Sequence, residues 1–197
     1  MSRMLVVVDY QNDFVNKNVL GFDGAEKLDA GIAARIREYD EKYDFIIETR
    51  DTHKENYMRT REGKHLPVMH CVEGTNGWET YGETGELLRE LDERQSCRYR
   101  RIDKATFGCH PYDMIDMVDW IRMNEVRLED IEEIEFVGLV SNICVISNIC
   151  VFQGAFPNAQ VLVDPNLIAS FNPSAHEAVL EVMQSLQVEF IGEGNWL

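Results

Sequence analysis

A cysteine, an aspartate and a lysine in this chain could together form a nucleophilic reaction centre. Cys144 lies in the run Glu-Ile-Glu-Phe-Val-Gly-Leu-Val-Ser-Asn-Ile-Cys-Val, residues 133–145. The apolar stretch 134–140 predicts a short buried strand, and residues 145–152 suit the first turns of a helix. Because the positive end of a helix lowers a thiol pKa, a cysteine at this junction is expected to be nucleophilic.

Asp9 and Lys104 have matching positions. Residues 5–8 form an apolar run, typical of a central parallel strand, that ends at Asp9, and Lys104 follows a second predicted strand at 97–102. Open α/β sheets place their sites at the carboxyl ends of strands. Taken singly, Asp9 could cap a turn, Lys104 could be a solvated charge and Cys144 a packed core thiol. Taken together, the carboxylate can accept the thiol proton and the ammonium can stabilise the thiolate.

A second group of polar residues has the types that bind a transition metal. Asp51 and His53 follow a predicted strand at 44–49, and alternate residues of an extended segment share a face. His70 would fold back from a predicted loop at 54–69. One carboxylate and two imidazoles suit Zn²⁺, Fe²⁺ or Mn²⁺ and leave coordination positions open, although ordinary turn residues of a polar loop would look the same. Further candidate ligands in that loop are Glu62 and His65.

Predicted strands and helices alternate along the chain. The strand candidates are 4–9, 44–49, 97–102, 133–140, 160–164 and 187–191. The helix candidates are 24–41, 80–93, 110–124, 142–155 and 173–186. This alternation implies an α/β fold of three layers, with a mostly parallel six-stranded, Rossmann-like sheet covered by helices on both faces. No linker interrupts the 197 residues, so we expect a single domain over 1–197.

The composition narrows the classes of partner. With 35 Asp and Glu against 19 Lys and Arg, the net charge of −16 argues against binding nucleic acid or an anionic membrane. The N-terminal apolar run is too short for a signal peptide, and no window has the apolar length of a transmembrane helix. The 5 cysteines are odd in number and form no CxxC pair, which suits reduced thiols. We expect a cytoplasmic homo-oligomer whose partner is a small molecule.

These motifs, in this order, resemble the isochorismatase-like cysteine hydrolases and, within them, the nicotinamidases. The matching segments cover nearly the whole chain: 7–14, 49–53, 70–75, 103–107 and 137–145. The resemblance implies a catalytic triad of Asp9, Lys104 and Cys144. It also implies a cis peptide bond between Leu139 and Val140, just before the nucleophile turn, with backbone N–H groups there holding the oxyanion.

The resemblance implies a metal and an activity as well. Asp51, His53 and His70 match the metal ligands of metal-dependent nicotinamidases, so we expect one divalent transition metal, with zinc first and iron or manganese as alternatives. The implied reaction is hydrolysis of a linear amide, nicotinamide and also pyrazinamide, to the free acid and ammonia through a thioester on Cys144, as in pyridine nucleotide salvage. The alternatives are another cysteine amidohydrolase with an N-carbamoyl or ureido substrate, and a non-catalytic binding protein with the same fold.

The chain departs from that family at several positions. Ser141 and Asn142 replace the usual Thr-Asp pair, and both are expected to cap the following helix. Pro67 stands where some nicotinamidases have a tryptophan that stacks on the substrate ring. Cys150, nearly two turns into the predicted helix, is expected to be a packed core thiol. The residues that could stack on the ring instead are Phe14, Phe107, Trp78 and Tyr112.

Overall fold

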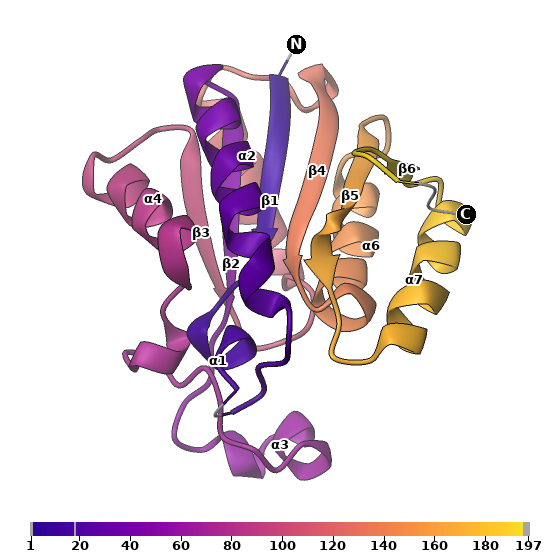
Figure 1. Cartoon of the computed structure of the whole chain (residues 1–197). Helices are drawn as coiled ribbons and strands as arrows, with labels where there is room; N and C mark the ends of the chain where they lie inside the picture. Colours follow the sequence, from indigo (N-terminus) through magenta and orange to yellow (C-terminus); the bar gives the residue numbers. More distant parts are fainter. Residues whose placement is uncertain (1, 18, 195–197) are drawn as a thin grey trace.

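The computed structural model describes residues 2–17 and 19–194, and an open six-stranded sheet lies at its centre (Figure 1). Its strands are β1 (Ser2–Val8), β2 (Phe45–Asp51), β3 (Tyr99–Lys104), β4 (Ile131–Leu139), β5 (Gln160–Ala169) and β6 (Glu189–Phe190). They lie in the order β3-β2-β1-β4-β5-β6, and all five neighbouring pairs are parallel. The sequence prediction of six strands in a mostly parallel sheet is confirmed.

The helices also follow the predicted positions. The longer ones are α2 (Asp29–Glu41), α4 (Gly82–Glu93), α5 (Pro111–Met123), α6 (Ile146–Ala155) and α7 (Pro173–Ser185). The short ones are α1 (Asn12–Val15), α3 (Arg61–His65), the 3₁₀ turns η1 (Ala25–Leu28), η2 (Tyr57–Arg59), η3 (Asn76–Trp78) and η4 (Leu128–Asp130), and a π-helical turn η5 (Ser141–Val145). Within residues 2–17 and 19–194, no helix is both long and apolar enough to cross a bilayer.

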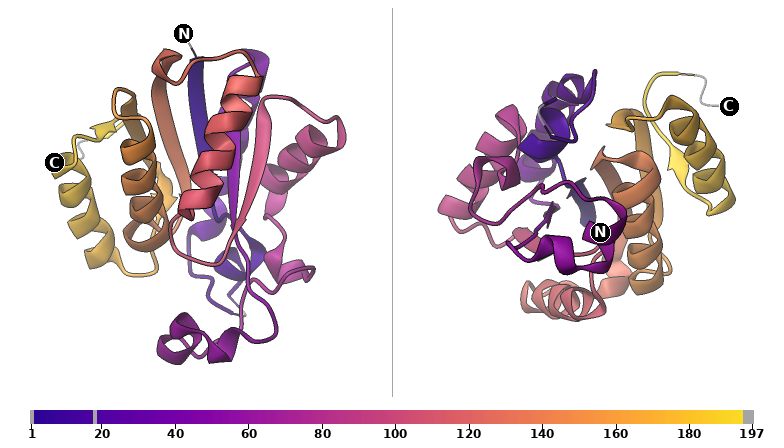
Figure 2. Two further views of the ribbon diagram at one scale, coloured as in Figure 1. Left: turned by 180° about the vertical axis from the view of Figure 1, so that it is seen from behind. Right: turned by 90° about the horizontal axis from the view of Figure 1, so that it is seen from below.

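Two apolar cores form because the side chains of each strand alternate between the faces of the sheet. On β1, Met4, Val6 and Val8 belong to one core, and Leu5 and Val7 belong to the other. The first core packs against α5, α6 and α7, and the second packs against α2 and α4. The views from front and back show helices over both faces, which gives the three layers expected from the sequence (Figures 1 and 2).

The chain reverses its direction across the sheet beside β1. It proceeds from β1 outward through β2 to β3, and then returns to β4 on the other side of β1. In open α/β sheets, ligands bind at the carboxyl ends of the strands at such a reversal. Gly138 on β4 has φ +111°, and a Cβ there would lie 2.1 Å from the Val8 carbonyl oxygen. Only glycine therefore allows β4 to approach β1 so closely next to the crevice.

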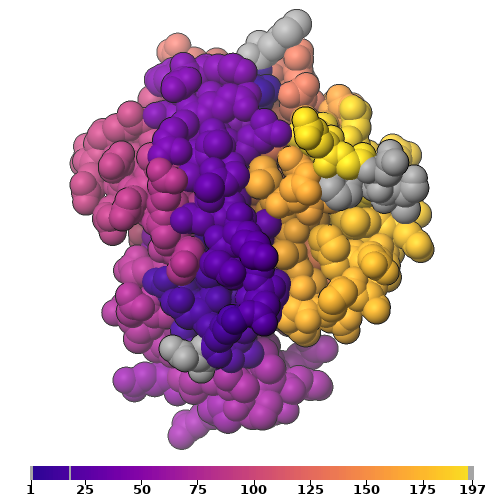
Figure 3. Space-filling view, viewed as in Figure 1, coloured from indigo at the N-terminus to yellow at the C-terminus, as the bar shows by residue number. Residues whose placement is uncertain are grey.

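The segment 54–69 contains η2 and α3, so its prediction as a plain loop is wrong. The Thr60 side chain accepts a hydrogen bond from Gly63 N and starts the short helix, while the Tyr57 hydroxyl donates to the Leu66 carbonyl at 2.8 Å. A helix of five residues shows no periodicity that sequence inspection could detect. The segment projects beyond the carboxyl ends of the central strands, at the lower end of the molecule in Figures 1 and 3.

Candidate active site and metal centre

Asp9, Lys104 and Cys144 meet at the carboxyl ends of β1, β3 and β4, and all three are buried. Lys104 Nζ donates to Asp9 Oδ2 at 2.6 Å, and Thr49 Oγ1 donates to Asp9 Oδ1 at 2.7 Å. The backbone of Asp9 is left-handed, with φ 46°, a conformation that costs energy in a non-glycine residue. The structure thus holds one carboxylate between an ammonium and a hydroxyl, in the same site as the thiol.

The electrostatics of the thiol differ from the sequence expectation. Burial raises the pKa of Cys144 well above its ordinary value; Lys104 opposes this rise, and Asp9 adds to it. The expectation that a helix N-terminus leaves a low thiol pKa is therefore wrong, because desolvation of the thiolate outweighs the nearby positive charge. The cysteine rests as a neutral thiol beside a base.

The same burial makes Asp9 a stronger base than an ordinary aspartate. Desolvation raises the pKa of Asp9, and the charge of Lys104 only partly opposes that rise. Burial disfavours the charged form of Lys104, but the neighbouring Asp9 carboxylate raises its pKa overall, so the ammonium persists. The pair can accept the proton of Cys144 while keeping a positive charge in place.

The nucleophile turn follows a cis peptide bond and is joined by hydrogen bonds to α7 and to the segment before it. The bond between Leu139 and Val140 is cis. Ser141 Oγ lies 2.9 Å from His176 Nδ1 of α7, and Asn142 Oδ1 accepts a hydrogen bond from Ser170 Oγ at 2.7 Å. Neither side chain caps η5, so their prediction as helix caps is wrong. Ser141 instead attaches the turn to α7, and Asn142 attaches it to the segment that leads into α7.

We expect His176→Phe to lower the free energy of unfolding by about 1–3 kcal/mol, because the fully buried Ser141 hydroxyl would lose its partner. Urea denaturation measures the change. The double variant Ser141→Ala/His176→Phe removes both partners and is expected to recover part of the loss. Equal stability of His176→Phe and the unaltered protein would contradict this account of the contact.

The predicted metal ligands come together, and Glu62 joins them. Asp51, His53, Glu62 and His70 offer ligand atoms that all lie within 4.8 Å of one another. Asp51 ends β2, and the turn of α3 brings in Glu62. His65, the last residue of α3, is exposed and bonds the Arg61 carbonyl through Nδ1, and it is not part of the cluster.

Three observations fit a divalent cation in this cluster. His70 Nδ1 donates to the Val68 carbonyl at 2.7 Å, which leaves the lone pair of Nε2 for a ligand bond. His53 Nε2 is buried and makes no hydrogen bond within the described residues, although it lies 2.9 Å from Asp51 Oδ2. Burial and the charge of Asp51 raise the pKa of Glu62, a repulsion that a cation would relieve.

Gln11 supports this cluster from the end of β1, a role that inspection of the sequence missed. Its Oε1 accepts a hydrogen bond from Asp51 N at 2.7 Å, and its Nε2 donates to the Asp51 carbonyl at 2.9 Å. Nε2 also donates to the Trp78 carbonyl at 2.8 Å. The only signal in the sequence is a glutamine two residues after Asp9, next to an apolar strand. The contact fixes the backbone of a metal-ligand candidate to the segment that carries the candidate base.

One cavity of about 1140 Å³ opens onto both groups. Its lining includes Cys144, all four residues of the metal cluster and several apolar side chains. Phe14 and Phe107 line it, and the Phe14 ring lies 5.5 Å from that of His70. Trp78, whose Nε1 donates to Thr52, and the exposed Tyr112 do not line the cavity, so their prediction as ring-stacking residues is wrong.

Cys150 and a second hollow lie outside this site. Cys150 is exposed, so the prediction of a packed core thiol is wrong, because its face of α6 turns toward solvent.

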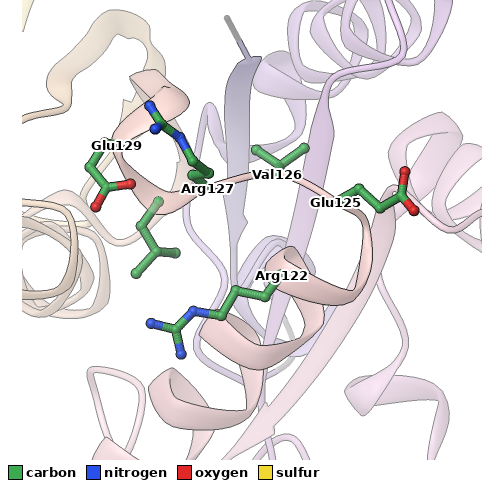
Figure 4. Close-up of a pocket in the computed structure, with 6 residues that line it drawn as sticks. Arg122, Glu125, Val126, Arg127 and Glu129 are labelled. Carbon is green, nitrogen blue, oxygen red and sulfur yellow. The ribbon is translucent and has the colours of Figure 1, made fainter.

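The second hollow, about 440 Å³, lies between α5 and β4, and its charged side chains point away from one another (Figure 4). Its lining offers no nucleophile: Arg122, Glu125, Val126, Arg127, Leu128 and Glu129.

The chain matches a known protein family and is similar in sequence to a curated relative. Residues 3–192 match the isochorismatase domain family. The chain is 25% identical to the nicotinamidase/pyrazinamidase of Mycobacterium tuberculosis over 197 residues, 96% of this chain and 98% of that protein.

Two solved structures have the same fold. The nicotinamidase/pyrazinamidase PncA from Bacillus subtilis has a TM-score of 0.83 and 23% identity, and the match covers 98% of this chain and 100% of the other. The pyrazinamidase of Pyrococcus horikoshii, solved in complex with zinc, has a TM-score of 0.76 and 22% identity, with 98% of this chain and 100% of the other covered. At these identities the likeness establishes the arrangement of strands and helices.

Proposed function

The chain belongs to the isochorismatase family, and on that premise we propose that it is an amidase that hydrolyses nicotinamide, and also pyrazinamide, to the free acid and ammonia. One observation carries the proposal: Cys144, beside the Asp9–Lys104 pair, and the four-residue metal cluster open onto the same cavity. The printed names of the relatives, nicotinamidase and pyrazinamidase, support the same substrate class.

In the proposed mechanism, Asp9 accepts the proton of Cys144 as the sulfur attacks the amide carbon. Lys104 stabilises the negative charge that this transfer moves toward the sulfur and the oxyanion. Backbone N–H groups of Val140 and Cys144 hold the oxyanion. Asp9 then gives its proton to the leaving ammonia, and water hydrolyses the thioester to the acid. The burial that raises the pKa of Asp9 suits a group that first accepts and then donates a proton.

Asp51, His53, Glu62 and His70 would hold one divalent metal, for which we propose zinc. When bound, it would supply a Lewis acid that orients the pyridine nitrogen of the substrate. Phe14 and Phe107 would contact the ring from the walls of the cavity.

The test is an ammonia-release assay on nicotinamide with the protein as purified. We expect release of ammonia together with equimolar nicotinate. Release from an N-carbamoyl substrate and none from nicotinamide would favour the alternative amidohydrolase. Absence of turnover on both would favour a binding protein that has this fold.

We expect about one transition metal per chain by elemental analysis, and its loss in His53→Ala, because a buried imidazole ligand would be removed. Chelation, or this substitution, is expected to raise KM for nicotinamide more than it changes the alkylation rate of Cys144, since the cluster would bind the ring and not the thiol. His65→Ala is the matched control for metal content, which it should keep, because that imidazole lies outside the cluster. Normal hydrolysis by metal-free protein in the presence of chelator would contradict the proposal.

A further inference from the structure

The cavity is larger than the proposed substrate requires. Its volume of about 1140 Å³ exceeds the ~300–1,000 Å³ of pockets that bind drug-sized ligands. Nicotinamide is a single pyridine ring with one carboxamide. A ring held between Cys144 and the metal cluster would therefore leave much of the space unfilled.

Part of the cavity wall is apolar. Val19 and Leu20 come from the segment after α1, Ile143 from the nucleophile turn, and Phe171 from the connection between β5 and α7. The rings of Phe22 and Phe171 meet edge to face at 6.4 Å, which joins two of these segments. Among the described residues, the segments that carry Val19, Leu20, Ile143 and Phe171 bring no charged side chain to the cavity. The charged side chains that line it come from residues 51–65.

Two aromatic side chains on this cavity are unusually open to solvent. Phe107 is 45% exposed and Phe171 is 58% exposed. Burial of exposed apolar surface by a ligand is favourable. The exposure places these rings at the rim, where they can cover the outer end of a ligand that reaches past the reaction centre.

The geometry of the pyridine ring of nicotinamide indicates which ring position an added substituent would occupy. In a six-membered ring, the nitrogen, the carboxamide-bearing carbon and position 5 point in three evenly spaced directions. With the carboxamide at Cys144 and the nitrogen toward His53 and His70, position 5 faces away from both polar groups. Resting on the proposed function, we propose that the apolar wall of Leu20, Ile143 and Phe171 is a subsite for an apolar substituent, so that the enzyme accepts 5-substituted nicotinamides.

Binding to Cys144→Ala tests this subsite without requiring turnover. By titration calorimetry of metal-loaded Cys144→Ala, we expect 5-phenylnicotinamide to bind roughly tenfold or more tightly than nicotinamide, since the phenyl group would be buried. Adding Leu20→Trp should fill the subsite and abolish that difference, and adding Phe171→Ala at the rim should reduce it. The matched control is Val182→Trp, on an α7 side chain that is 49% exposed and outside the cavity, which should leave the difference unchanged.

The outcomes separate the two proposals. Equal or weaker binding of 5-phenylnicotinamide, or a preference that survives both Leu20→Trp and Phe171→Ala, would overturn the subsite. Tighter binding of the phenyl compound that depends on Leu20 and Phe171 would support it. If the unaltered protein released no ammonia from either compound while this binding pattern held, the proposed amidase function would be wrong and the apolar subsite would stand.

Discussion

Replacement of Cys144 by alanine is expected to abolish ammonia release from nicotinamide, with kcat falling on the order of 10⁴-fold or more. Among the described residues, Cys144 is the only cysteine that lines the cavity, and it interacts with both Asp9 and Lys104. Without it no thioester forms, and the remaining groups can only orient the substrate. Steady-state kinetics and metal analysis of the purified variant measure the effect, and metal content should be unchanged.

Cys150→Ala is the matched control, because Cys150 lies on the same stretch of chain but is exposed. Its kcat should stay within about twofold of the unaltered protein, as expected for a surface substitution. An inactive Cys150→Ala together with an active Cys144→Ala would reverse the assignment of the nucleophile.

Asp9→Asn and Lys104→Met are each expected to lower kcat on the order of a thousandfold, because the base, the ammonium and the thiol act as a unit. Asn keeps the size of Asp9 but cannot accept the thiol proton. Met keeps the length of Lys104 but removes the charge that opposes the rise in the Cys144 pKa. Iodoacetamide should therefore alkylate Cys144 more slowly in Lys104→Met near neutral pH.

The pH profile of kcat/KM provides a second readout for Asp9. The pKa of Asp9 is raised by burial, so the base is lost as pH falls through that raised value, and activity should decline on the acid side above the ordinary aspartate value of about 3.9. Thr49→Val, which removes a hydrogen bond to the Asp9 carboxylate, should move this limb to higher pH. If Thr49→Val left the acid limb of the kcat/KM profile unchanged, the limb would not report the titration of Asp9. If iodoacetamide alkylated Cys144 equally fast in Lys104→Met, Lys104 would not act on the nucleophile.

The candidate triad could be predicted because each member lies near the carboxyl end of a predicted strand. The run 5–8 identifies β1 and hence the position of Asp9, and Lys104 and Cys144 follow from the same rule. Their convergence depends on the strand order, which places β1 between β2 and β4 and which no local pattern contains. The order is a tertiary property, since it depends on how the helices cover the sheet.

Other features of the site have no local signal. Burial raises the thiol pKa of Cys144 and outweighs the opposing charge of Lys104. The contact between Ser141 and His176 joins residues 35 positions apart, and neither is unusual in its own segment. Glu62 enters the metal cluster only because Thr60 starts the short helix α3, where the sequence reads as a polar loop.

Gln11 holds Asp51 by its backbone N–H and carbonyl, so these bonds do not depend on the side chain at position 51. The end of β2 stays fixed against the segment of Asp9 whichever residue occupies that position. The hydrogen bonds that fix β2 beside the segment of Asp9 therefore do not involve the metal-ligating carboxylate of Asp51. A point substitution at position 51 would remove a metal ligand and leave these two backbone hydrogen bonds in place.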